Sequence, residues 1–223
     1  MFLHGWGCDG NSLLGLKKAL EGELRVTTLD MYGFGKTPHP EAPLFLCDYA
    51  KAIVDIIFKY KMPRVVLVGH SFGGRVAMYL AIHYARMLDK IVLINPSGMR
   101  PHRNIKYIVR ILTYKTLKKL NYKSNKLGSK DYIATTGVMR KTFVNIVNEH
   151  LDRNIKKIIT PTLIIHGDKD SDIPYYMIKR INKRIKKSCV KVIHGTGHFC
   201  HIESPNEVVA AIKEFIGGEY DDD

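Results

Sequence analysis

A serine flanked by glycines follows an apolar run in the first half of the chain. The run is 65–68, the serine is Ser71, and Gly69 and Gly73 stand two residues before and after it. An apolar strand that leads into such a serine, with a helical stretch directly after it, is typical of a sharp strand-to-helix turn. The turn lifts the hydroxyl out of the sheet and directs backbone N–H groups at the same point, where they stabilise negative charge. The pattern predicts a nucleophilic serine.

A base and an acid for this serine occur later in the chain. A serine hydroxyl is a weak nucleophile until a base takes its proton. His198 follows an apolar stretch and is the candidate base, and Asp168, Asp170 and Asp172 follow another apolar stretch that lies between the serine and the histidine. An imidazole in this role needs a carboxylate that holds its tautomer and stabilises its charged form. The order serine, acid, histidine, each after a strand, is the one expected of α/β hydrolases.

Five segments in the expected order resemble the α/β-hydrolase superfamily, and among its members the small esterases. They are 4–7, 29–37, 69–74, 167–174 and 197–205. In the family the acid segment reads G-x-x-D-x-x-x-P, and Gly167, Asp170 and Pro174 have that spacing. The resemblance therefore assigns the acid to Asp170, and we expect Asp168 and Asp172 to be solvated loop residues.

The resemblance also implies the chemistry of the site. Ser71 would attack an acyl carbonyl, His198 would move the proton, and Asp170 would orient His198. The oxyanion hole would consist of the backbone N–H of Phe72, which follows the serine, and that of Trp6, which follows the His-Gly pair. The expected function is hydrolysis of small carboxylic esters or related acyl compounds, with no cofactor and no metal.

Two other functions stay open at this point. A carbon–carbon bond hydrolase of the same fold keeps the same triad, and a non-catalytic binding protein would use the pocket only as a receptor. The intact set of serine, acid and histidine disfavours the receptor. A serine at position 71 argues against the dehalogenase and epoxide-hydrolase branches, which have a carboxylate there.

Strands and helices are expected to alternate, which predicts a mainly parallel sheet with helices on both faces. The expected strands are 1–4, 25–30, 64–69, 90–95, 161–166 and 189–194, and the expected helices are 10–21, 47–60, 72–86, 175–186 and 205–216. Members of the family usually have two strands before the one that leads to the His-Gly pair. Because this chain begins three residues before His4, we expect these N-terminal strands to be missing.

Residues 99–158 interrupt the alternation. Helical patterns occur at 105–120 and 132–148, at the point of the chain where family members carry a cap over the active site. We therefore expect an α/β-hydrolase core formed by 1–98 and 159–223, with a short helical cap or lid formed by 99–158.

Most of the positive charge lies in this expected cap. The chain has 223 residues and a net charge of +14, and residues 99–158 hold 15 Lys or Arg against three acids. Such a field favours an anionic substrate or an acidic carrier protein, although a solvated lysine-rich surface explains it equally well. No nucleic-acid recognition motif accompanies the charge. Without an apolar stretch of about 18 residues, a secretory signal or a disulfide framework, the sequence predicts a cytoplasmic protein without a transmembrane segment.

Overall fold

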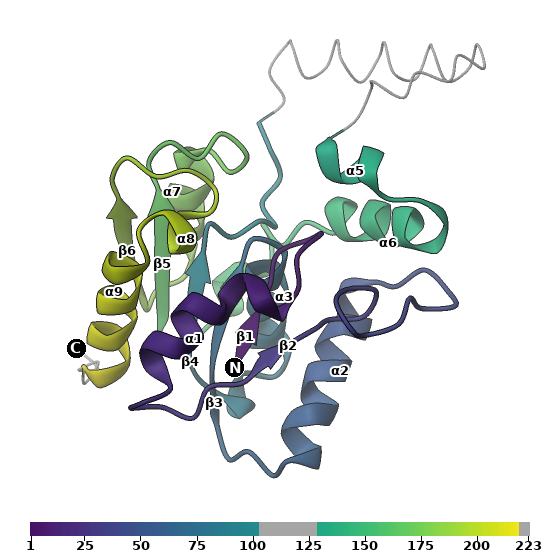
Figure 1. Ribbon diagram of the computed structural model, residues 1–223. Helices are drawn as coiled ribbons and strands as arrows, with labels where there is room; N and C mark the ends of the chain where they lie inside the picture. Colours follow the sequence, from purple (N-terminus) through teal and green to yellow (C-terminus); the bar gives the residue numbers. More distant parts are fainter. Residues whose placement is uncertain (103–128, 219–223) are drawn as a thin grey trace.

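Six parallel strands form the sheet at the centre of the molecule. The computed structural model describes residues 1–102 and 129–218, and the order of the strands in the sheet is β2-β1-β3-β4-β5-β6 (Figure 1). The strands are β1 (Phe2–Leu3), β2 (Thr28–Leu29), β3 (Val65–His70), β4 (Leu88–Ile94), β5 (Thr162–Gly167) and β6 (Ser188–Ile193). Every neighbouring pair is parallel. The predicted parallel sheet is confirmed.

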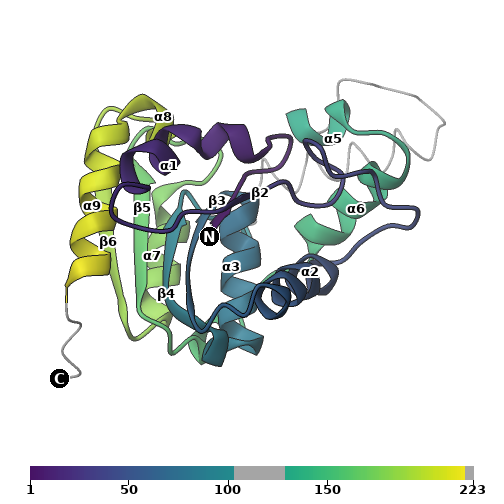
Figure 2. The same cartoon turned by 60° about the horizontal axis from the view of Figure 1, so that its bottom comes forward.

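Helices cover both faces of this sheet. Figures 1 and 2 show α1, α8 and α9 on one face and α2, α3 and α7 on the other. Their bounds are α1 (Leu14–Leu20), α2 (Leu46–Lys59), α3 (Phe72–His83), α7 (Tyr175–Arg184), α8 (Cys200–Glu203) and α9 (Pro205–Gly217). None of the helices in 1–102 and 129–218 is long and apolar enough to cross a membrane.

The strand sequences explain why both faces are covered. Successive side chains of a strand point to opposite faces. In β4, Ile91 and Leu93 pack in the core beneath α2, α3 and α7, whereas Val92 and Ile94 pack in the second core beneath α1 and α9. All four side chains are fully buried, and burial of each contributes about 1.5–3 kcal/mol. A strand that is apolar on both faces requires helices on both faces, as in other parallel sheets.

β1 and β2 are shorter than the strands expected at 1–4 and 25–30. The chain leaves the sheet at His4, whose Nδ1 donates to the backbone oxygen of Gly5 at 2.7 Å and whose Nε2 accepts from the backbone nitrogen of Met31 at 3.0 Å. The imidazole thus replaces the backbone ladder where β1 and β2 end, and it fixes the loop that follows β1 against the loop that follows β2.

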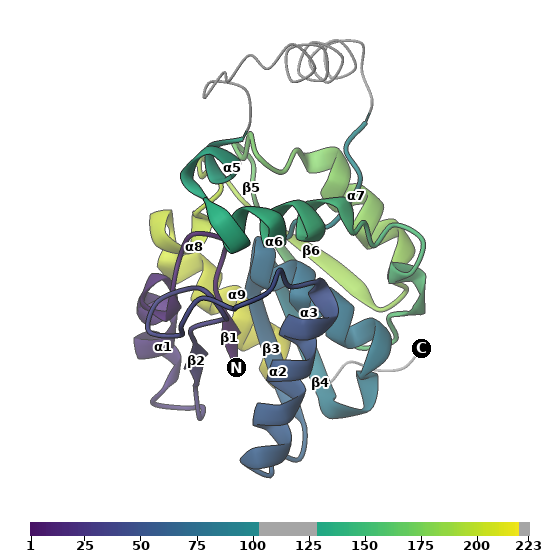
Figure 3. The same ribbon diagram turned by 90° about the vertical axis from the view of Figure 1, so that its right-hand side faces the viewer.

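Two further helices lie beyond the sheet, at the end where β3 leads into α3 (Figure 3). They are α5 (Lys130–Ala134) and α6 (Gly137–Asn148). The start of α2 holds α6 and the residue after it in place. The backbone nitrogen of Leu44, just before α2, donates to Thr142 Oγ1 at 3.0 Å, and that of Leu46, the first residue of α2, donates to Glu149 Oε2 at 3.2 Å.

The single helix expected over 132–148 is wrong, since the structure has two helices there. Thr136 has extended backbone (φ −134°) and Gly137 has a φ of +54°. A left-handed residue after an extended one cannot continue a helix, and the two β-branched residues Thr135 and Thr136 disfavour it as well. The helical pattern at 105–120 lies outside the described residues.

Candidate active site

Ser71 stands at the turn from β3 to α3 with φ 49° and ψ −105°. This backbone region is strained for a residue with a side chain. The two glycines of the pattern are needed for close contacts: a Cβ at Gly69 would overlap the backbone of Gly73, and a Cβ at Gly73 would overlap the backbone of Leu3 in β1. The glycines therefore let α3 start against the sheet, which brings the Ser71 hydroxyl to the edge of the sheet.

The turn is fixed by hydrogen bonds to the backbone of Ser71. Its nitrogen donates to the Ile94 oxygen of β4 at 2.9 Å. Its oxygen accepts from the backbone nitrogens of Arg75 and Ser97, both at 3.1 Å, and from Ser97 Oγ at 3.2 Å. Contacts from α3 and from the segment after β4 thus hold the strained residue.

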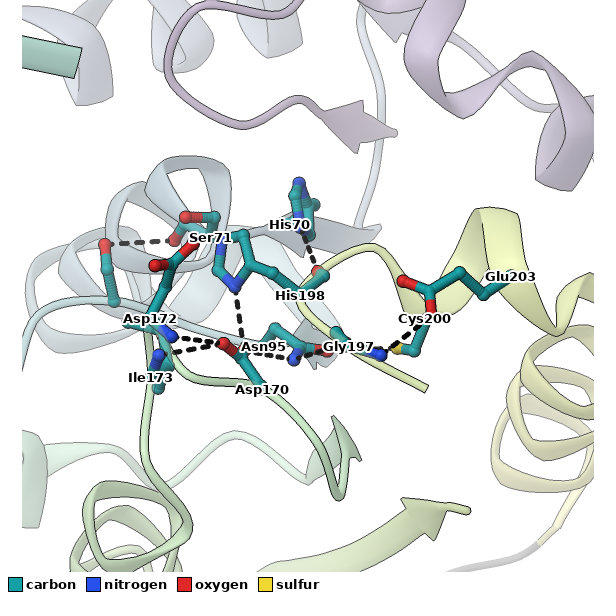
Figure 4. Close-up of polar contacts among 11 residues, drawn as sticks. His70, Ser71, Asn95, Asp170, Asp172, Ile173, Gly197, His198, Cys200 and Glu203 are labelled. Carbon is teal, nitrogen blue, oxygen red and sulfur yellow. Dashed lines mark hydrogen bonds and ion pairs between the residues drawn. The ribbon is translucent and has the colours of Figure 1, made fainter. Parts of the chain in front are cut away.

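Asp170 and His198 are joined by a hydrogen bond of 2.7 Å between Asp170 Oδ2 and His198 Nδ1 (Figure 4). The other carboxylate oxygen, Oδ1, accepts from the backbone nitrogens of Asp172 at 2.8 Å and Ile173 at 2.9 Å. Burial raises the pKa of Asp170, but the hydrogen bonds from His198, Ile173 and Asn95 outweigh it and lower the pKa to about 2. Asp170 is therefore a buried carboxylate that stays ionised at neutral pH.

Asn95, directly after β4, is a part of the site that the sequence reasoning missed. Its Nδ2 donates to Asp170 Oδ2, the oxygen that also faces His198, and to the backbone oxygen of Gly197 at 3.3 Å (Figure 4). Its Oδ1 accepts from the Cys200 thiol at 3.0 Å. The available signal was a polar residue directly after an apolar strand, at the edge where the serine, the acid and the histidine also lie.

Asp170 has no acceptor capacity left for a cation. A carboxylate offers about four lone-pair sites, and its four donors are Asn95, His198 and the two backbone nitrogens already described. In the described parts of the chain, Asp170, Asp172 and His198 are the one group whose potential ligand atoms lie within 4.8 Å of one another. Because Asp170 is saturated, these residues form a hydrogen-bonded site rather than a set of metal ligands.

Replacement of Asn95 by alanine is expected to lower kcat of the hydrolytic reaction by about 10-fold to 100-fold, with KM nearly unchanged. The variant loses one hydrogen bond to a charged group, which contributes about 1.5–3 kcal/mol. The carboxylate then holds His198 less firmly. Steady-state kinetics on one ester decides this. Asn148→Ala is the control, because within 1–102 and 129–218 the Asn148 amide donates only to the backbone oxygen of Val144 in its own helix. An unchanged kcat in Asn95→Ala would show that Asn95 does not position the acid.

Ser71 and His198 line one cavity of about 640 Å³ at the ends of the strands. Trp6 and Phe72 line the same cavity, as do Phe143 and Ile146 of α6. No hydrogen bond joins Ser71 to His198 among the described residues, a common state of ligand-free sites whose catalytic hydrogen bonds shorten when substrate binds. The volume lies within the range of small-molecule sites, about 300–1,000 Å³.

The three acids of the loop after β5 have different surroundings. Asp168 is exposed and bonds His194 Nδ1 at 3.0 Å and the backbone nitrogen of Gly195 at 2.8 Å. Asp172 is exposed as well, but it lines the cavity near His198. The structure thus brings Asp170 to His198, leaves Asp168 outside the cavity, and places Asp172 at the cavity wall.

Trp6 contributes its side chain to the cavity wall. Its ring packs against Phe34, Phe72 and Phe143, with ring centroids 4.9, 5.4 and 5.1 Å apart. Such tilted and edge-on contacts are favourable for aromatic pairs. They fix the loop after β1 against the start of α3 and against α6.

Two buried histidines support the loop of His198. His70 Nε2 lies 2.9 Å from the backbone oxygen of His198, so Nε2 carries the proton in this bond. The His201 ring lies 4.4 Å from that of His70. Burial lowers the pKa of His70 well below its usual range and that of His201 to about 4, and the neighbouring His198 shifts both in the same direction. Both rings are therefore neutral in the folded protein at neutral pH.

This histidine pair predicts that the protein loses stability in weak acid. In the unfolded chain His201 takes up a proton below pH ~6.5, whereas in the folded protein it does so only near pH 4. Between these values the unfolded state binds more protons, so the free energy of unfolding falls by up to about 1.4 kcal/mol per pH unit for one such histidine. Urea unfolding at pH 7, 6 and 5 measures the slope.

The variant His201→Gln is expected to show a shallower slope, because it removes one of the groups. His39→Gln is the matched control, because it removes one exposed histidine and leaves the buried pair in place. Equal slopes in wild type and His201→Gln would mean that His201 titrates normally in the folded state.

Strand order, the Ser71 turn and the cavity at the strand ends define the α/β-hydrolase fold. The sequence profile of the "Alpha/beta hydrolase family" matches residues 1–212. The chain therefore belongs to this family, and the resemblance inferred from the sequence is confirmed.

Two of the relatives that this chain resembles are named for different hydrolytic activities. A Haemophilus influenzae protein named "Putative esterase/lipase" is 26% identical in an alignment that spans 97% of this chain and 82% of that protein. A Pseudomonas putida 2-hydroxy-6-oxo-2,4-heptadienoate hydrolase is 27% identical in an alignment that spans 87% of this chain and 79% of that protein. Among solved structures, an Exiguobacterium antarcticum esterase matches with a TM-score of 0.78 and 23% identity over 97% of this chain and 91% of its own. That structural likeness concerns the fold alone.

Proposed function

We propose that this protein is a serine hydrolase that cleaves small carboxylic esters or related acyl compounds. The observation that carries the proposal is the hydrogen bond between His198 and the buried, ionised Asp170, in a cavity that His198 shares with the strained Ser71. The name of the Haemophilus influenzae relative supports the ester as the bond that is cleaved.

In the first half of the proposed reaction, Ser71 Oγ attacks the acyl carbonyl carbon while His198 Nε2 takes the serine proton. The carbonyl oxygen becomes an oxyanion, which accepts hydrogen bonds from the backbone N–H groups of Phe72 and Trp6. The carbon–oxygen bond to the leaving group then breaks, and His198 returns the proton to the leaving alcohol. Asp170 stays ionised and stabilises the imidazolium that forms in between.

In the second half, a water molecule attacks the acyl group on Ser71. His198 takes a proton from this water, the bond between the acyl carbon and Ser71 Oγ breaks, and the serine regains a proton from His198. The products are a carboxylic acid and the free enzyme. Both halves of the reaction transfer only protons and an acyl group, so no electron donor or acceptor takes part.

We also propose that residues 99–158 act as a cap on a core of 1–98 and 159–223. Two observations support this division: α6 contributes Phe143 and Ile146 to the cavity wall, and the base of the segment is closed by the Leu151 nitrogen, which donates to the Gly98 oxygen at 3.0 Å. Such a cap would shape the acyl pocket and exclude water from it. Most of the basic charge expected of the cap falls in 103–128, outside the described residues.

Fluorophosphonate labelling tests whether Ser71 is a reactive nucleophile, and a panel of substrates tests which kind of bond the protein cleaves. Labelling at Ser71, together with turnover of p-nitrophenyl esters of graded chain length, is the expected result. A protein that neither labels nor turns over any ester would be a receptor rather than a hydrolase.

Carbon–carbon bond hydrolysis is the second candidate, because the Pseudomonas putida relative is named for a dienoate substrate of that class. A vinylogous 1,5-diketone acid belongs in the same panel. If Ser71 is labelled and this compound is cleaved, but no ester is hydrolysed, the ester is not the substrate class. Ser71 would still be the nucleophile.

A further inference from the structure

A buried arginine lies one helical turn after the proposed nucleophile. Arg75 belongs to α3, is 5% exposed, and lines the same cavity as Ser71. Ser71 directly precedes this helix, and the backbone nitrogen of Arg75 donates to the Ser71 oxygen at 3.1 Å, so the two residues are one helical turn apart, about 6 Å of rise. Helical side chains also lean toward the N-terminus of their helix. The Arg75 side chain therefore leans toward the Ser71 end of α3.

Most of the hydrogen-bonding capacity of this guanidinium is unused. A guanidinium has five N–H donors. Among the described residues its one hydrogen bond runs from Nη1 to the backbone oxygen of Ile146, and the buried Nε has no partner. Glu149 attracts the charge from a distance, but no carboxylate of the described residues lies within 4.0 Å of Arg75. A buried charge without an ionic partner is energetically costly. Because an anion bound at the guanidinium would offset this cost, Arg75 is suited to bind one.

The guanidinium keeps its charge in this environment. Burial lowers the pKa of Arg75 to about 10, so the side chain is protonated at neutral pH. The contact with Ile146 lies at the C-terminal part of α6, where a helix favours a cation. This contact accounts for part of the cost of burial and leaves the other donors available.

Two acids also line this cavity, one of them close to His198. They are Asp131 of α5 and Asp172, and the pKa of Asp131 is raised by burial and by the charge of Asp172. Asp172 lies near His198, which must protonate the leaving group. An anionic leaving group would therefore meet the negative charge of Asp172. We infer that the anionic group that pairs with Arg75 belongs to the acyl part of the substrate.

We propose that Arg75 forms an anion subsite for the acyl group, and that the preferred substrates are monoesters of short dicarboxylic acids. This proposal rests on the proposed function, since it names the substrate class of the same site. The free carboxylate of the acyl group binds the guanidinium, which suits a planar anion with two oxygens. The short separation of Ser71 and Arg75 along α3 limits the acyl group to a few carbon atoms.

Binding to an inactive protein tests the subsite without catalysis. In the Ser71→Ala protein, calorimetry compares glutarate with dimethyl glutarate, which has the same carbon chain and no charge. We expect glutarate to bind at least tenfold more tightly. The double variant with Arg75→Gln should lose this preference, and that with Lys130→Gln should keep it, because Lys130 is an exposed cation that lines the same cavity. Equal binding of the two compounds would overturn the proposal.

Kinetics on the wild-type protein gives a second measurement that does not require the Arg75 variant to fold. The p-nitrophenyl monoesters of glutarate and adipate are compared with their methyl-capped counterparts, after subtraction of spontaneous hydrolysis. We expect kcat/KM to favour the free carboxylate by tenfold or more for at least one chain length. Turnover of both series without preference would overturn the proposed anion subsite and would still support the esterase activity. Glutarate binding without turnover of any ester would overturn the esterase activity and would still support the subsite.

Discussion

Replacement of Ser71 by alanine is expected to lower kcat/KM for ester hydrolysis by about 10⁴-fold or more. The serine, the histidine and the acid of a triad act as a unit, so loss of the nucleophile removes the covalent route altogether. The residual rate would come from the oxyanion hole and from substrate binding. The measurement is steady-state hydrolysis of p-nitrophenyl acetate by purified protein, together with fluorophosphonate labelling, which should disappear.

Ser97→Ala is the matched control for this change. Ser97 lines the same cavity, and its hydroxyl donates only to the backbone oxygen of Ser71. Loss of one neutral hydrogen bond costs about 0.5–1.5 kcal/mol, so the rate should fall by no more than about tenfold. Turnover near that of the wild type in Ser71→Ala would remove the serine-hydrolase proposal.

Replacement of Asp170 by asparagine is expected to lower kcat by about 10⁴-fold. The carboxylate accepts four hydrogen bonds, from Asn95, His198 and the backbone nitrogens of Asp172 and Ile173. An asparagine side chain has one acceptor oxygen and one NH₂ group, which cannot accept a hydrogen bond. Whichever way the amide is turned, the NH₂ group would face two of these four donors. Either His198 loses the acceptor that fixes its tautomer, or the two backbone nitrogens lose theirs. Steady-state kinetics with circular dichroism separates lost catalysis from lost folding.

Asp168→Asn is the control, because Asp168 is an exposed acid of the same loop that bonds His194 and Gly195. Its kcat should stay within a few-fold of the wild-type value. Asp172→Asn should also cost little, since its carboxylate is not the one that bonds His198. A loss of several orders of magnitude in Asp172→Asn, with an active Asp170→Asn, would reassign the acid.

The sequence alone determined the features that depend on neighbouring residues. The Ser71 turn follows from an apolar strand and from glycines at fixed positions, because close backbone contacts admit no side chain there. The parallel sheet follows from strands that are apolar on both faces. The choice of Asp170 over Asp168 and Asp172 came from the spacing that the family resemblance supplied, and the structure shows the corresponding hydrogen bond to His198.

Features that depend on residues far apart in the chain were decided only by the tertiary structure. Asn95 is 75 positions from Asp170 and 105 from Cys200. It meets Asp170 because β4 and β5 are neighbours in the sheet, and Cys200 reaches it from α8, after the last strand. Arg75 looks in the sequence like one more charged residue after the serine, and its burial and its contact with Ile146 of α6 are visible only in the tertiary structure. Strand pairing and helix packing set which side chains meet, and these contacts leave no periodic pattern in the local sequence.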